Sequence, residues 1–195
     1  TGNENTAIGS SSLGTLTTGS NNTAVGRTSL FANTANNNTG VGYYSLFANT
    51  TGTKNVAVGA EALDANTTGS SNTAVGSVAL SANTTGINNV SVGHNSSLAN
   101  TTGAANTALG QRALASNISG NNHVAIGRGA LEANTIASSN TAVGHSALNS
   151  NTSGANNVAV GTQALDAVTT GDENAGCGDN ALSLLTTGIK NTAVG

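Results

Sequence analysis

Apolar and polar residues alternate along the chain in a pattern that repeats every 17 residues. One glycine of the repeat recurs at this spacing from Gly9 to Gly195, with a single step of 16 residues between Gly26 and Gly42. Counted from its asparagine as position one, the consensus is N-T/V-A-V-G-x-x-A-L-x-A-N-T-T-G-x-x. We call each copy a coil. Eleven full coils follow one another from Asn5 to Lys190, and a twelfth begins at Asn191. The pattern indicates one repeat domain over 1–195, which we expect to be a segment of a longer chain.

A repeat of this length favours short strands. It is too short for a helical hairpin, which needs roughly 33 residues or more. Val, Thr and closely spaced Gly are typical of short strands with tight turns. We predict one strand in N-T-A-V-G, a second in A-L-x-A-N-T and a turn in T-G-x-x. Coils stacked at the strand spacing of about 4.8 Å form an all-β parallel solenoid or β-roll, a rod roughly 53 Å long.

Two positions carry the large aliphatic residues, and we predict that both line the core. Position four is Val in most coils, as at Val25, Val58, Val75, Val143 and Val160. Position nine is Leu, as at Leu63, Leu80, Leu114, Leu131, Leu148 and Leu165. The exception at position nine is Ser97, where a shift of the chain would let Leu98 take its place. Small residues at positions three, eight and eleven imply that two backbone layers approach closely.

Asparagine recurs at two positions of the coil. Position one includes Asn55, Asn72, Asn89 and Asn106, and position twelve includes Asn66, Asn83 and Asn100. Stacked side-chain amides can hydrogen-bond along the axis of a cross-β assembly, and such ladders satisfy polar groups in a thin interior. Leu16, Val168 and Leu185 replace asparagine at position twelve, which indicates that this rank points inward.

Charged residues are few and confined to particular positions. They make up 7% of the chain, with a net charge of −3, against about 25% in an average domain. All lie at positions six, seven, ten, sixteen or seventeen, so we expect those positions to face solvent or a partner. No basic patch suits nucleic acid, and no apolar run reaches the roughly 20 residues of a membrane span. We expect no nucleic-acid partner and no membrane insertion of this segment.

The four aromatic residues form one candidate contact patch. Phe31, Tyr43, Tyr44 and Phe47 also occupy positions six, seven and ten. They could contact a sugar or a protein, or form a ladder that strengthens coil stacking.

No catalytic constellation is visible. His94 and His145 share position six but lie three coils apart, about 14 Å along the axis, which is too far for one metal-ligand set. The acidic residues Asp172, Glu173 and Asp179 lack the glycine pattern of a calcium-binding repeat. We therefore expect no enzyme activity, no metal and no cofactor.

Several single residues have a structural interpretation. His123 replaces an asparagine of the first ladder. Cys177 replaces Val at position four, so we predict a buried, inert thiol. Triplets such as Asn49-Thr50-Thr51 match the N-glycosylation sequon, but an inward asparagine cannot carry a glycan.

Pairs of threonine recur at positions thirteen and fourteen, as at Thr67-Thr68. Regular threonine arrays on β-solenoids resemble ice-binding surfaces, although only one residue of each pair can lie on a given face of a strand.

Over essentially its whole length, the motif N-T-A-V-G-x-x-A-L-x-x-N-T-T-G resembles repeats of phage tail fibres and bacterial surface proteins. It is also similar to the head repeats of trimeric autotransporter adhesins, in which an A-I-G motif recurs on a left-handed parallel β-roll. These resemblances imply a homotrimeric, extended protein that serves attachment and is extracellular, on a cell surface or on a virion.

We therefore expect a structural rod of an extracellular filament, surface appendage or phage tail fibre that self-assembles into a trimer or a filament. One alternative is an adhesin head whose positions six, seven and ten bind a surface receptor or glycan of a host or matrix. Those positions vary widely between coils, which favours the rod. The other alternative is an ice-binding solenoid.

Overall fold

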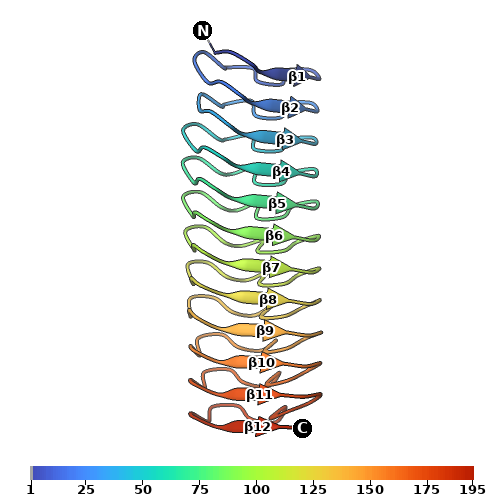
Figure 1. Ribbon diagram of the computed structural model, residues 1–195, viewed down its shortest axis with the longest axis vertical. Helices are drawn as coiled ribbons and strands as arrows, with labels where there is room; N and C mark the ends of the chain where they lie inside the picture. The colour runs from blue at the N-terminus through green and yellow to red at the C-terminus, as the bar shows by residue number, and fades with distance from the viewer. Residues whose placement is uncertain (1) are drawn as a thin grey trace.

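The computed structural model describes residues 2–195 and is a β-solenoid of about eleven turns (Figure 1). Each coil contributes one strand of three residues, and none of the described residues is helical. The strands are β1 (Thr6–Ile8), β2 (Thr23–Val25), β3 (Thr39–Val41), β4 (Val56–Val58), β5 (Thr73–Val75), β6 (Val90–Val92), β7 (Thr107–Leu109), β8 (Val124–Ile126), β9 (Thr141–Val143), β10 (Val158–Val160), β11 (Ala175–Cys177) and β12 (Thr192–Val194). The predicted all-β parallel solenoid of 17-residue repeats is confirmed.

All twelve strands form one parallel sheet in which each strand pairs with the strands of the coils before and after it. Each residue pairs with the same repeat position in the next coil, as Thr73 does with Val90. In Figure 1 the strands therefore stack in a single column from β1 to β12. The 16-residue coil keeps this register, since Val25 still pairs with Val41. Side-chain ranks consequently run the length of the rod.

The predicted second strand is absent, and that prediction is wrong. Residues at positions seven and nine adopt left-handed backbone angles, with φ of 51° at Val78 and 54° at Leu80. These angles lie outside the β region. The segment is instead a series of turns, in which the Asn83 amide donates to the Leu80 carbonyl at 3.2 Å. The Leu80 amide also donates to the Ser96 carbonyl of the next coil at 2.9 Å, so the turns are held by the stack.

The backbone conformation at position five explains why this residue is always glycine. Gly76 has a φ of +132°, and an added Cβ would lie 2.7 Å from the carbonyl oxygen of Gly93 in the next coil. Only glycine adopts this conformation without strain. The strand therefore ends at the same position in every coil.

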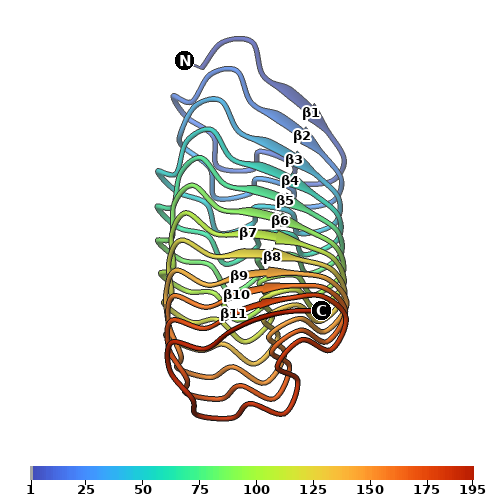
Figure 2. The same ribbon diagram turned by 60° about the horizontal axis from the view of Figure 1, so that its bottom comes forward.

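The leucines of position nine form the core, as predicted. Leu63, Leu80, Leu114, Leu131, Leu148 and Leu165 are all fully buried. Alanine at position three faces them from the sheet, and alanine or serine at position eight is also buried. Positions eight and nine are adjacent, yet both side chains point inward. In an extended strand neighbouring side chains would face opposite sides, but this segment is a turn. Figure 2 shows these loops closing each coil opposite the strands.

The valines of position four do not form the core, and this prediction is wrong. Val58 and Val160 are 37% and 39% exposed, and Val25, Val75 and Val143 are half-buried. Alternate residues of a strand face opposite sides of a sheet. The alanine of position three occupies the inner side, so positions two and four must point outward.

The core is interrupted at the sixth coil. Buried apolar residues form one cluster that ends at Leu80 and another that begins at Ala108. Ser97 occupies the place of leucine, 2% exposed, and keeps the usual backbone bond to Ala113. Leu98 stays half-buried at position ten, so the predicted shift does not occur.

Candidate interaction surface

The outer face of the sheet consists of positions two and four of the coils in all twelve strands and runs along the whole sheet. It carries Thr or Val at position two, apart from Ala175 in β11, and Val, Ile or Leu at position four, apart from Cys177. No charged residue occurs at either position. Val56, Val90, Leu109, Ile126 and Val158 are between 36% and 43% exposed. We call this surface the outer sheet face.

Threonine hydroxyls on the outer sheet face are unused within the described chain. Thr73, Thr107 and Thr141 of position two donate no side-chain hydrogen bond to another described residue. From β3 to β10 they alternate with valine, coil by coil. The face therefore presents regularly spaced free hydroxyls among exposed methyl groups.

The threonine pairs predicted as an array behave differently. At position thirteen the hydroxyl donates to the carbonyl of the next coil, as Thr67 does to Thr84 at 3.0 Å. At position fourteen the side chain is exposed, as at Thr51, Thr68 and Thr85. Each pair thus contributes one residue to the stack and one to a single exposed row.

The two predicted asparagine ladders are present and buried. At position one, the Asn72 amide N–H donates to Oδ1 of Asn55 at 3.0 Å. At position twelve, Nδ2 of Asn83 donates to Oδ1 of Asn66 at 2.8 Å. The same contacts recur through the other predicted members, Asn89, Asn100 and Asn106. Both ladders run inside the rod along its axis.

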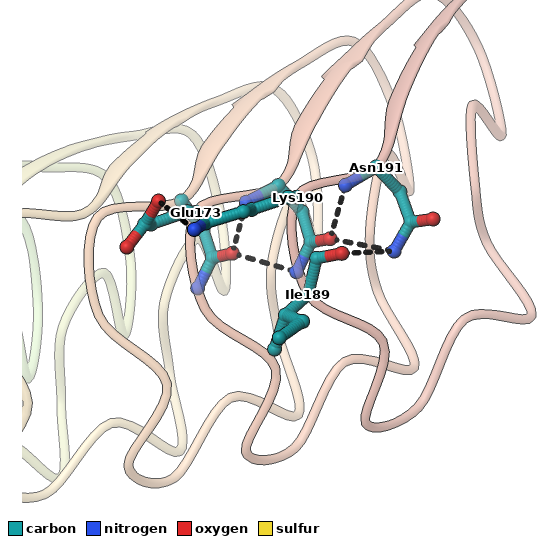
Figure 3. Close-up of polar contacts among 6 residues, drawn as sticks. Glu173, Ile189, Lys190 and Asn191 are labelled. Carbon is teal, nitrogen blue, oxygen red and sulfur yellow. Dashed lines mark hydrogen bonds and ion pairs between the residues drawn. The ribbon is translucent and has the colours of Figure 1, made fainter.

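In coils that carry both ladder asparagines, the two ladders meet at one backbone carbonyl. Nδ2 of Asn72 and Nδ2 of Asn83 both donate to the Gly86 carbonyl, at 2.9 and 3.1 Å. Figure 3 shows the end of the first ladder, where the backbone N–H and Nδ2 of Asn191 both donate to Asn174, each at 3.0 Å. Asn72 and Asn83 thereby each link their own coil to the preceding one and close their own turn.

The second ladder ends where valine replaces asparagine. Val168 is fully buried, as the inward orientation predicted from this substitution requires. Its side chain has no N–H to donate, and Oδ1 of Asn151 in the preceding coil is left without a hydrogen-bond partner.

His123 takes over both roles of the asparagine that it replaces. Its Nδ1 accepts from the Asn140 amide at 3.3 Å, and its Nε2 lies 2.7 Å from the Ala137 carbonyl. These partners fix the neutral tautomer with hydrogen on Nε2. Burial lowers the pKa of His123, against the opposing effect of the two backbone bonds. The structural interpretation of this residue fits its contacts.

The aromatic patch is a stacked ladder. The Phe31 and Phe47 rings lie 5.5 Å apart and nearly parallel, and Tyr44 stacks on Phe47 at 4.6 Å. The Arg27 guanidinium lies 5.8 Å from the Tyr43 ring centre. Phe31, Tyr44 and Phe47 thus each stack on another ring of the patch, which favours the stacking interpretation, while Tyr43 remains 43% exposed.

The histidines and acidic residues considered as metal ligands either lie apart or pair with a residue of an adjacent coil. His94 and His145 do not meet, and no group of three His, Cys, Asp or Glu in residues 2–195 is arranged for a metal. Glu173 pairs with Lys190 at 3.8 Å (Figure 3), and Asp172 accepts from the Ala155 amide at 2.7 Å. The described part of the chain has no pocket.

Cys177 is exposed, so the prediction of a buried thiol is wrong. The cause is the same as for valine, since position four points outward. None of the charged residues is buried as a whole, but Oδ1 of Asp64 and Oδ1 of Asp166 are enclosed without a hydrogen-bond partner, so these two carboxylates face solvent only in part. Among residues 2–195 there is also no helix that could span a lipid bilayer.

Comparison with known proteins gives no relative. No family model, no curated protein and no solved structure matches this chain.

The outer sheet face, which the sequence analysis missed, could have been found from the single alanine between Thr and Val, since alternation then places both larger residues on one side.

Proposed function

We propose that the chain is a non-catalytic structural rod that assembles with copies of itself through the outer sheet face. The observation that carries this proposal is the uncharged, exposed or half-exposed rank of valine, isoleucine and leucine along eleven of the twelve strands, with Cys177 in its place in β11. An extracellular filament, a surface appendage or a phage tail fibre would use such a rod to space or present binding elements.

The size of the face supports a contact between copies. Twelve strands of three residues span roughly 53 by 10 Å, or about 500 Å² in projection. Two such faces together bury on the order of 1,000 Å², which is near the lower limit for a specific interface. Charges at the rim, such as Arg27 and Lys54, keep the rest of the surface soluble.

The interior supports the rod itself. Each coil holds its neighbour through backbone bonds, leucine packing and two asparagine contacts. Stability in such a stack grows with nearest-neighbour contacts. An array of this kind is stiff along its axis and offers no enclosed space for a substrate.

The test is the mass of the chain in solution, measured by sedimentation and light scattering, with electron microscopy for shape. We expect a multiple of the 18.7 kDa protomer. In the variant Val75→Lys/Val160→Lys, two charges on the outer sheet face should return the protein to a monomer. The matched control Ser77→Lys/Thr162→Lys adds the same charges two residues further on, at exposed loop positions of the same coils, and should assemble like the wild type.

Cys177 supplies a second readout without mutation, because it lies on the same face. Its reaction with a thiol reagent should slow as protein concentration rises. A wild-type chain that remains monomeric at high concentration would contradict the proposal. So would the same oligomeric mass for Val75→Lys/Val160→Lys and for the control Ser77→Lys/Thr162→Lys. A closed trimer and an open filament are distinguished by particle shape.

Ice binding is a second candidate, and the free hydroxyls at position two favour it. Thr73, Thr107 and Thr141 present unpartnered hydroxyls beside exposed methyl groups on a rigid, periodic surface. Thermal hysteresis that is lost in Val75→Lys/Val160→Lys and kept in the control would support this function. Absence of hysteresis in the wild type would remove it.

A further inference from the structure

Ten asparagines of the chain stand in an N-glycosylation sequon, and the fold divides them sharply. Seven are at most 1% exposed. These seven, which we call the ladder sequons, are Asn49, Asn66, Asn83, Asn89, Asn100, Asn117 and Asn151. Asn21 and Asn37 are exposed, and Asn95 is half-buried with its Ser97 enclosed in the core.

The side-chain nitrogen of a ladder sequon is already fully committed. Both hydrogens on Nδ2 of Asn66 are donated, one to Oδ1 of Asn49 at 2.7 Å and one to the Gly69 carbonyl at 3.0 Å. N-glycosylation joins C1 of the sugar to Nδ2, breaks the C1–O bond to the diphosphate of the activated donor, and releases one proton from Nδ2. One ladder acceptor would therefore lose its donor.

The sugar would also have no space. Neighbouring coils lie about 4.8 Å apart, and the ladder asparagines are enclosed on all sides. A hexose is far larger than the gap, so the coil that carries it cannot close on the next. An unpaired buried amide acceptor adds a cost of roughly 1–3 kcal/mol.

The exposed pair offers the opposite environment. Asn21 and Asn37 lie at position seventeen of the turn before the strand, and their side-chain amides make no hydrogen bond to another described residue. The sequon hydroxyls belong to Thr23 and Thr39 on the half-exposed rank of position two. A glycan there projects into solvent without touching either ladder.

We propose that N-glycosylation of the ladder sequons and folding of the solenoid exclude each other, and that Asn21 and Asn37 are the positions at which the folded rod accepts an N-linked sugar. The chain must then complete its coils before, or away from, any enzyme that glycosylates unfolded sequons. This inference is independent of the proposed self-assembly.

The experiment uses a soluble N-glycosyltransferase with a nucleotide-diphosphate hexose, added either before or after refolding from denaturant. Modified residues are mapped by mass spectrometry, and folding is read from protease resistance. Added to the folded chain, the enzyme should modify Asn21 and Asn37 and leave the ladder sequons at least tenfold less occupied. Added to the unfolded chain, it should modify the ladder sequons and prevent refolding.

A matched variant removes the ladder sequons without touching their asparagines. It replaces the third residue of each triplet: Thr51→Ala, Thr68→Ala, Thr85→Ala, Ser91→Ala, Thr102→Ala, Ser119→Ala and Ser153→Ala. Treated while unfolded, this variant should refold and carry sugar at Asn21 and Asn37. Protease-resistant wild-type chains with sugar on a ladder asparagine would overturn the proposal, as would a folded chain unmodified at both Asn21 and Asn37.

Discussion

The fifth and sixth coils share one backbone and differ inside. The fifth coil, from Asn72, has Ala74 and Leu80 in the core, both fully buried. The sixth, from Asn89, has Ser91 and Ser97 at the same positions, and neither hydroxyl has a hydrogen-bond partner. The apolar core is broken at this level, yet the coil still closes and stacks.

The ladders explain why the sixth coil keeps its shape. Asn89 still bonds to Asn72, and Asn100 still bonds to Asn83, with the usual distances of 3.0 and 2.9 Å. Coil geometry is thus fixed by hydrogen bonds along the axis, and leucine adds stability without defining the path. Among the interior coils, hydrogen exchange should accordingly be fastest in the sixth, since local opening is easiest where few apolar contacts are buried.

The largest effect should come from copying the defect into the fifth coil. Leu80→Ser removes a fully buried leucine, which costs about 2–5 kcal/mol, and leaves a buried hydroxyl without a partner. We expect a loss of about 3–5 kcal/mol in the free energy of unfolding, measured by chemical denaturation. Val75→Ser, on the outer sheet face of the same coil, should cost less than about 1 kcal/mol. Equal losses would contradict the division between core and face.

Breaking the ladder should cost nearly as much. Asn83→Ala leaves Oδ1 of Asn66 without a partner and removes one of the two acceptors of Asn100 Nδ2, which keeps the Gly103 carbonyl, so we expect a loss of about 2–4 kcal/mol in the same measurement. Val168→Asn is the control, because it satisfies Asn151 but leaves its own new oxygen unpaired, and should change stability by less than about 1 kcal/mol. A harmless Asn83→Ala would show that leucine packing, not the ladder, defines the coil.

Repairing the sixth coil should give a smaller gain. Ser97→Leu fills the core position, and Ser91→Ala removes the other unpaired hydroxyl. Together we expect a stabilisation of about 1–3 kcal/mol and slower hydrogen exchange across coils five to seven. No change in exchange would mean that the two core clusters already open together.

His123 is a polar replacement that is satisfied, unlike the serines of the sixth coil, and its effect should depend on pH. The pKa of His123 is lowered in the folded chain. Below its pKa in the unfolded chain, about 6.5, the unfolded chain therefore binds a proton that the folded chain does not bind. The contribution of His123 to the free energy of unfolding is therefore fully present above that pH, and it falls by up to about 1.4 kcal/mol per pH unit below it. Denaturation curves between pH 7 and 5 should show this fall, and His123→Asn should lack it; identical profiles would contradict the assignment.

Much of the interior was predictable from single positions. The leucine rank and both ladders follow from a strict period, because a residue that recurs every 17 positions must stack on its own copy. Val168 confirmed the inward direction of the second ladder. The outer sheet face was not predicted, because valine and leucine are equally apolar and only the direction of each side chain separates them.

The sequence by itself determined the repeat, the parallel stacking and the residues that pair between coils, since periodicity fixes register. Only the tertiary structure decided which apolar rank lies inside. Left-handed angles at Val78 and Leu80 turn the chain where a second strand was expected, and the single real strand directs only its middle residue, which is Ala, Ser or Gly, to the inner side. Backbone conformation therefore placed leucine in the core and valine and Cys177 on the surface.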